Sequence, residues 1–136
     1  MEYCADGNWR PPGICALTRE DEGFRWTSNL SYALQHPETN PDRELPIRRW
    51  VSTVSGPARL AVSHSVRGTF GDGTRALLLV DGDELWRHDA IAGDAAGAQM
   101  TFDVQLRIGT VIDQLVHPID SSADDTTYFE LRIEGR

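Results

Sequence analysis

The sequence contains no lysine: all 13 of its basic residues are arginine, against 21 Asp and Glu, so the net charge is −8. Partners that carry many phosphates need clustered basic side chains to neutralise them. The only adjacent basic pair here is Arg48-Arg49. The composition therefore argues against nucleic acid and against an anionic membrane surface as partners. A lysine-free chain rich in Ala, Gly, Asp and Arg is also typical of a GC-rich, bacterial coding sequence.

Long hydrophobic runs are also absent. A membrane-spanning helix needs about 18 to 20 apolar residues in a row, and no segment approaches that length. No membrane insertion is therefore predicted. The start, MEYCADGNWRPPG, lacks the basic and apolar regions of a secretory signal peptide, although a removed signal would leave the same sequence. The final IEGR matches the recognition site of factor Xa, as a cloning remnant or by coincidence.

Cysteine is scarce, with only Cys4 and Cys15. The ten residues between them include Pro-Pro and two glycines, and a disulfide closing such a loop would contribute roughly 2–3 kcal/mol. The turn-rich loop favours a disulfide, with two free thiols as the alternative. Structural zinc is not expected, because it needs four ligands and no histidine pair has ligand spacing.

Familiar catalytic motifs are missing as well. The chain has no Gly-x-Ser-x-Gly, no P-loop and no His-Glu-x-x-His, which argues against an enzyme. His64 lies among apolar residues of a predicted strand, where a hydrogen-bonded core histidine is the usual interpretation. A small hydrolase with two catalytic carboxyl groups remains as a third alternative, because the chain has many carboxylates.

Alternation of apolar and polar residues dominates the sequence from Ile47 onward. In AQMTFDVQLRI (98–108), residues Met100, Phe102, Val104, Leu106 and Ile108 are predicted to face inward, as in a half-buried antiparallel strand. RALLLV (75–80) is a continuous apolar run that predicts a central strand buried on both faces. Strands are expected near 47–53, 59–67, 75–80, 84–91, 99–108, 111–117 and 127–133. The spacing predicts an all-β, antiparallel, jelly-roll-like β-sandwich.

The N-terminal third differs from the rest. Residues 1–46 are punctuated by prolines and are predicted to form an irregular wrap around the strands of 47–134, within one domain of 1–136. A helical turn is expected at Thr18–Gly23. A short strand is expected within Phe24–Leu34.

An acidic stretch, TFGDGTRALLLVDGDELWRHD (69–89), could be a metal-binding loop or a β-hairpin. The spacing of its acids fails the EF-hand pattern from either Asp72 or Asp81. Asp81-Gly82 is instead a strong type I′ turn signal between two strand-like runs. The hairpin is therefore preferred, with Leu85 and Trp86 expected to face opposite ways.

A second acidic cluster precedes the last strand. Its carboxylates, with nearby Ser and Thr oxygens, would suit calcium, a hard cation that takes six to eight oxygen ligands. The alternative, a solvated acidic loop, is slightly favoured. The candidate metal ligands are Asp120, Asp124 and Asp125.

Four pieces occur in an order that suggests a known family: RRWVSTVSG (48–56), GDG (71–73), LVDGDELW (79–86) and DDTTYFELRI (124–133). In this order they resemble the jelly-roll accessory modules of bacterial extracellular proteins, of carbohydrate-binding-module or galactose-binding-like type. The resemblance covers roughly 47–134. One departure is Gly109-Thr110, where such modules often have Gly-Asp.

The resemblance implies a non-catalytic carbohydrate-binding module on an extracellular or cell-surface protein, with an optional structural calcium ion. Such modules stack aromatic rings on sugars and orient hydroxyl groups with polar side chains. The candidates are Trp9, Trp26, Trp86, Tyr128, Arg75, His88 and Asp89, whereas Trp50 is assigned to the core. The alternative is an assembly or adhesion domain that contacts another protein through edge strands or its acidic face. The oligomeric state is left open.

Overall fold

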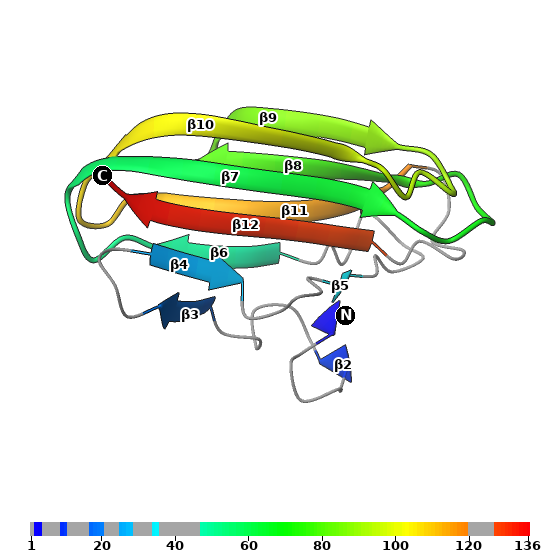
Figure 1. Cartoon of the computed structure of the whole chain (residues 1–136), viewed down its shortest axis with the longest axis horizontal. Helices are drawn as coiled ribbons and strands as arrows, with labels where there is room; N and C mark the ends of the chain where they lie inside the picture. Colours follow the sequence, from blue (N-terminus) through cyan, green and yellow to red (C-terminus); the bar gives the residue numbers. More distant parts are fainter. Residues whose placement is uncertain are drawn as a thin grey trace.

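The computed structural model describes residues 47–119 and 127–136 in full (Figure 1). Within residues 1–46 it describes the backbone of five short strands: β1 (Glu2–Tyr3), β2 (Trp9–Arg10), β3 (Leu17–Glu20), β4 (Arg25–Ser28) and β5 (Leu34–Gln35). The possible Cys4–Cys15 disulfide and the candidate calcium ligands Asp120, Asp124 and Asp125 lie outside the described residues.

The all-β prediction is confirmed. The described residues form no helix, and every strand pair is antiparallel. Each strand predicted beyond residue 46 is present with its limits shifted by at most a few residues. These strands are β6 (Ile47–Val51), β7 (Gly56–Val66), β8 (Thr74–Val80), β9 (Asp83–Ala90), β10 (Ala98–Leu106), β11 (Val111–Pro118) and β12 (Thr127–Gly135).

The strand order defines the type of sandwich. Sheet A contains β10-β7-β12, and β4 pairs with the far side of β12; sheet B has the order β6-β11-β8-β9. The chain therefore crosses repeatedly between two four-stranded layers, β4-β12-β7-β10 and β6-β11-β8-β9, which is the jelly-roll arrangement. The prediction of a jelly roll is confirmed, and strands β5, β1 and β2 extend sheet A beyond β12.

The predicted helical turn at Thr18–Gly23 is wrong where the structure describes it. Leu17–Glu20 is strand β3, and Thr18 lies opposite Thr27 of β4 in an antiparallel pair. Pairing with a neighbouring strand has overridden the local capping signal, because β4 is itself held against β12. The short strand expected within Phe24–Leu34 is confirmed as β4.

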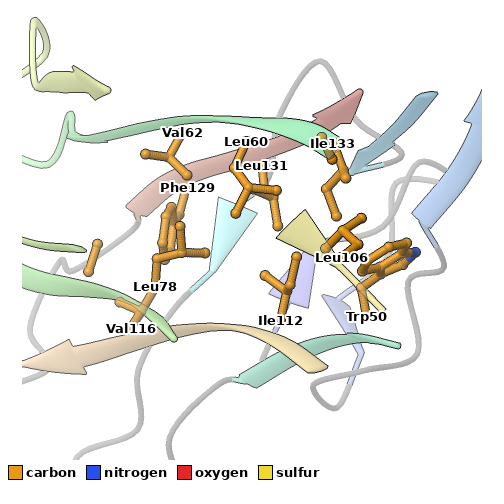
Figure 2. Packing of buried hydrophobic residues seen from close by; sticks show 12 residues of the cluster. Trp50, Leu60, Val62, Leu78, Leu106, Ile112, Val116, Phe129, Leu131 and Ile133 are labelled. Carbon is orange, nitrogen blue, oxygen red and sulfur yellow. The ribbon is translucent and has the colours of Figure 1, made fainter. Parts of the chain in front are cut away.

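The core lies between the two sheets (Figure 2). Inward side chains of β7 and β12, including Leu60 and Phe129, meet inward side chains of β8 and β11, including Leu78 and Ile112. Trp50 is only 7% exposed, which confirms its assignment to the core. Full burial of one large apolar side chain contributes about 1.5–3 kcal/mol, so this layer is the main source of stability.

Two predictions of burial need correction. Strand β8 is central in sheet B, but only Thr74, Ala76 and Leu78 on its inward face are buried. Leu77 and Leu79 on the outer face are partly exposed. In the alternating series from Met100 to Ile108, only Leu106 is buried; Ile108 follows the strand and is 74% exposed. The reason is the position of β10 at the end of sheet A.

The inward face of β10 is covered unevenly. Leu106 belongs to the core, and Phe102 and Val104 pack against it. The cover therefore ends towards the start of the strand. This explains why Met100 is 47% exposed although its alternation marks it as an inward residue.

The acidic stretch at 69–89 is a β-hairpin, as predicted. Asp81 and Gly82 have φ of 51° and 86°, the positive values that a type I′ turn needs at both central positions. The Asp81 carboxylate accepts a hydrogen bond from the Val111 backbone N–H at 2.8 Å. Its charge therefore anchors the turn to β11 instead of holding a metal.

Candidate functional site

The structure separates the candidate ligand-binding residues into three groups. Trp86 and His88 face inward from β9, while Arg75 and Asp89 lie opposite each other on the outer face of sheet B. Tyr128 lies on the outer face of sheet A, where the Arg67 guanidinium is 4.6 Å from its ring centroid. The backbone of Trp26 pairs with Ile133 in sheet A, and its side chain is not described. The described side chains of the candidates therefore do not form one site.

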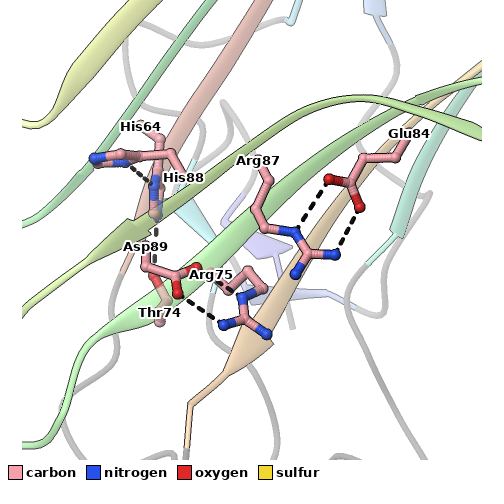
Figure 3. A network of polar contacts seen from close by, with 7 residues as sticks. All are labelled: His64, Thr74, Arg75, Glu84, Arg87, His88 and Asp89. Carbon is pink, nitrogen blue, oxygen red and sulfur yellow. Dashed lines mark hydrogen bonds and ion pairs between the residues drawn. The ribbon is translucent and has the colours of Figure 1, made fainter.

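The inward group continues into a chain of hydrogen bonds (Figure 3). Nδ1 of His88 lies 2.8 Å from Nδ1 of His64, and Nε2 of His64 lies 3.0 Å from the Thr74 hydroxyl. The Thr74 hydroxyl is in turn 2.8 Å from that of Thr127. The chain thus runs from an edge strand into the core and links both sheets. His64 is the hydrogen-bonded core histidine that its position predicted.

His64 is held in its neutral form. Burial, as the main cause, and the neighbouring His88 together lower its pKa from 6.5 to about 3, while Asp94 and Asp89 partly oppose this shift. A neutral imidazole has one N–H and one acceptor nitrogen. If His64 donates to His88 it accepts from Thr74, and if it donates to Thr74 it accepts from His88. Both arrangements satisfy every ring nitrogen of His64.

His88 is anchored on one side only. Its Nδ1 is fixed by His64, whereas its Nε2 points away from this network and makes no hydrogen bond within the described residues (Figure 3). Its ring stacks on Trp86, with centroids 5.8 Å apart and an interplanar angle of 14°. The result is a paired aromatic surface with one polar atom available, on a strand that ends its sheet.

Trp86 is positioned by an irregularity in β9. The register shifts between Leu78 and Leu79, so that Leu78 pairs with Trp86 and Leu79 pairs with Glu84. Leu85 is the extra residue of this β-bulge, and both Leu85 and Trp86 pack against the core. The expectation that these two side chains face opposite ways is therefore wrong, because a bulge breaks the alternation of a strand.

The outer face of the same hairpin carries paired charges. Arg75 makes two hydrogen bonds of 2.7 Å to Asp89, and Arg87 makes bonds of 3.1 and 2.7 Å to Glu84. The hydrogen bonds from Arg75 hold the pKa of Asp89 below its usual value. These side chains are well exposed, so each pair contributes little to stability. Their chemical consequence is that both guanidinium groups are already occupied by carboxylates.

No metal site is seen near these residues. Among residues 47–119 and 127–136, no three side chains of His, Cys, Asp or Glu converge closely enough to hold an ion. The part of the chain that is described also contains no helix long and apolar enough to cross a membrane.

Two features of the site were missed from the sequence. Thr74 and Thr127 gave no signal, because they meet only through the packing of sheet A on sheet B. The anchoring of His88 by His64 was also missed, although both residues stand at inward positions of their strands and alternation could have placed them on facing sheets.

Comparison with known proteins gives structural neighbours only. No family model and no curated sequence matches the chain. A family 35 carbohydrate-binding module from Clostridium thermocellum superimposes with a TM-score of 0.44 at 14% identity, over 89% of this chain and 88% of that one. A family 35 module from an environmental isolate gives 0.46 at 14% identity, over 92% and 88%.

A third similar structure is a cycloisomaltooligosaccharide glucanotransferase from Paenibacillus sp., complexed with cycloisomaltoheptaose. It superimposes with a TM-score of 0.39 at 17% identity, over 85% of this chain. The match covers 18% of that enzyme.

Proposed function

We propose that this chain is a non-catalytic carbohydrate-binding module that binds a neutral sugar at Trp86 and His88. The observation that carries the proposal is the stacked pair itself, with the His88 Nδ1 fixed from behind and its Nε2 left available. Both rings are partly exposed because β9 is the edge strand of sheet B.

The chemistry of the pair suits a sugar. A pyranose offers an apolar C–H face, which packs on an aromatic ring, and a rim of hydroxyl groups that need hydrogen bonds. The hydrogen-bond chain through His64 can run in either direction, so the His88 Nε2 can donate or accept, as a hydroxyl group also can. Because His64 fixes the His88 ring, little rotamer freedom is lost on binding.

The charges favour a neutral sugar over an acidic one. The chain has a net charge of −8, and the guanidinium groups of Arg75 and Arg87 on the same hairpin are engaged by Asp89 and Glu84. An anionic sugar would therefore meet repulsion without a free cation from these two side chains to offset it.

Binding to a panel of soluble neutral and uronic-acid polysaccharides tests the proposal. We expect affinity for a neutral member, reduced about ten-fold by Trp86→Leu, which removes the ring, and about ten-fold by His88→Phe, which keeps the ring but removes its nitrogens. Isothermal titration calorimetry on the polysaccharide selected by a glycan array measures both. Tyr128→Leu, on the outer face of sheet A, is the matched control and should bind normally.

Three results would contradict different parts of the proposal. A flat glycan array, or binding that survives both substitutions in folded variants, would reject the site. Loss of binding on Trp26→Leu alone would move the site to β4, and selective binding of uronic-acid polymers would contradict the argument from charge. Circular dichroism melts check that each variant is folded.

The structural calcium ion remains a separate proposal, carried by the sequence of Asp120, Asp124 and Asp125. We expect calcium at millimolar concentration to raise the melting temperature relative to EDTA, and Asp124→Asn to abolish the difference, because each carboxylate supplies hard oxygen ligands. Equal melting temperatures in EDTA and in calcium for the natural sequence would exclude the ion. An extracellular or cell-surface location is proposed with it, since calcium at that concentration is found outside cells.

A further inference from the structure

Strand β10 is an edge strand without the usual protection. It is nine residues long, its pairing with β7 runs in one unbroken register, and β7 is its only partner among the described strands. It contains no proline and one charged residue, Asp103. Exposed strand edges of this kind offer unpaired backbone N–H and C=O groups, and proteins normally block them with charges, bulges or proline.

Strand β9, the edge strand of sheet B on the same side of the sandwich, has the protection that β10 lacks. Strand β9 is interrupted by the bulge at Leu85, and its exposed side chains include Asp83, Glu84, Arg87 and Asp89. In β10 the exposed residues are mostly uncharged and include Met100, at 47% exposure. Only one of the two neighbouring edges is therefore open to another strand.

The residues of β10 on the two sides of Phe102 are chemically compatible with one another. Reading outward from Phe102, the residues at equal distances are Thr101 and Asp103, Met100 and Val104, and Gln99 and Gln105. We propose that β10 pairs antiparallel with β10 of a second copy of this chain, about a two-fold axis at Phe102. Such an isologous contact places every residue opposite its counterpart at equal distance from the axis.

The pairing that results is chemically matched on both faces. On the inward face, Phe102 meets Phe102 of the second copy and Met100 meets Val104. On the outer face, Thr101 meets Asp103 and Gln99 meets Gln105, so no like charges are opposed. Directly opposed side chains are the main source of pairing energy between strands, and opposed like charges weaken it.

If β9 is paired in the same way with β9 of a second copy, about a two-fold axis, like charges are brought together. Centred on the middle of Asp83–Ala90, this pairing sets Glu84 against Asp89 of the second copy, twice over. The match in β10 is therefore not shared by β9, the neighbouring edge strand. Together with the open edge it selects a second copy as the partner.

The axis of this contact runs perpendicular to sheet A, so both copies of sheet B lie on one side of the joined sheet. The exposed side chain of Met100 then lies against Val104 of the second copy, beside Phe102 and Val104 of its own chain, which pack against the core. Resting on the proposed function, this arrangement would also hold two sugar sites on one assembly and raise affinity for a polymer through avidity.

Sedimentation velocity of the whole chain without sugar, over about 1 to 200 µM, tests the dimer. Thr101 is exposed and directly faces Asp103 of the second copy, whose carboxylate lies 3.3 Å from Arg59 and 3.7 Å from Arg136 of its own chain. A charge introduced at residue 101 should therefore change the affinity of the dimer according to the sign of that charge. We expect Thr101→Asp to raise the dimer dissociation constant about ten-fold and Thr101→Arg to lower it, with both effects reduced in 0.5 M salt.

A second pair of variants controls for exposed apolar area. Met100→Lys should abolish the dimer, whereas Ile91→Lys, a change at a 72% exposed residue in the turn before β10, should leave it intact. A chain that stays monomeric over the whole range overturns the proposal, as do equal effects of the two Thr101 variants or of the two lysine variants. None of these measurements depends on sugar binding, so failure here leaves the proposed function standing.

Discussion

Acidification from about pH 7.5 to about pH 4.5 is expected to remove about 3 kcal/mol of unfolding free energy through His64 alone. The side chain is 1% exposed, and its pKa is lowered from 6.5 to about 3 in the folded protein. Burial is the main cause and the adjacent His88 is the second. The folded state therefore resists taking up a proton that the unfolded chain accepts readily.

The direction of the effect follows from the two pKa values. Because the folded pKa lies below the unfolded one, the unfolded state binds more protons between about pH 3 and 6.5. The contribution of His64 is nearly complete at about pH 7.5, where both states are almost entirely neutral. It is lost progressively as the pH falls through this window.

Urea unfolding at a series of pH values measures the effect, and His64→Gln isolates it. Gln keeps a donor and an acceptor for Thr74 and His88 but does not titrate. Subtracting its profile removes shared contributions such as Asp89, whose pKa is lowered by Arg75, and Glu130, whose pKa is raised by burial. Parallel stability curves for the natural sequence and His64→Gln between about pH 4.5 and 7.5 would show that His64 is not buried as described.

Replacing Phe129 by alanine is expected to cost about 3–5 kcal/mol of unfolding free energy. Its side chain is fully buried, and its ring lies 5.9 Å from that of His64 and 6.1 Å from that of Trp86. Removing it opens a cavity at the centre of the core and also withdraws support from the proposed site. The loss is large against the 5–15 kcal/mol that is typical of a domain.

Phe129→Leu is the matched control, because it retains most of the apolar volume and should cost about 1–1.5 kcal/mol. Chemical denaturation monitored by tryptophan fluorescence measures both variants. A loss below about 1 kcal/mol for Phe129→Ala would mean that β12 does not present this side chain to sheet B. Equal losses for the two variants would mean that shape, and not volume, controls the packing here.

Several parts of the fold could be predicted from local patterns. Alternation located β7 and β12 within a few residues, since a strand with one buried face must repeat every two positions. Asp81-Gly82 identified the β8–β9 hairpin because few residues tolerate positive φ at both turn positions. His64 was placed in the core by the apolar residues around it. These features depend on neighbours in the chain, which the sequence contains.

The candidate site could not be assembled in the same way. Whether Trp86 faces inward depended on a bulge, and whether Arg75 shares a face with Trp86 depended on the register of β8 against β9. The exposure of Met100 depended on where along β10 the packing against the core ends.

The sequence by itself therefore determined the strands, the inward faces of β7 and β12 and the hairpin turn, because these follow from the backbone geometry of consecutive residues. The tertiary structure alone decided which side chains meet: His88 with His64 across the sheets, Thr74 with Thr127, and Arg75 with Asp89 away from both tryptophan and histidine. The physical reason is that a one-residue change of register moves a side chain to the opposite face of its sheet. Register is fixed by packing between strands distant in the chain.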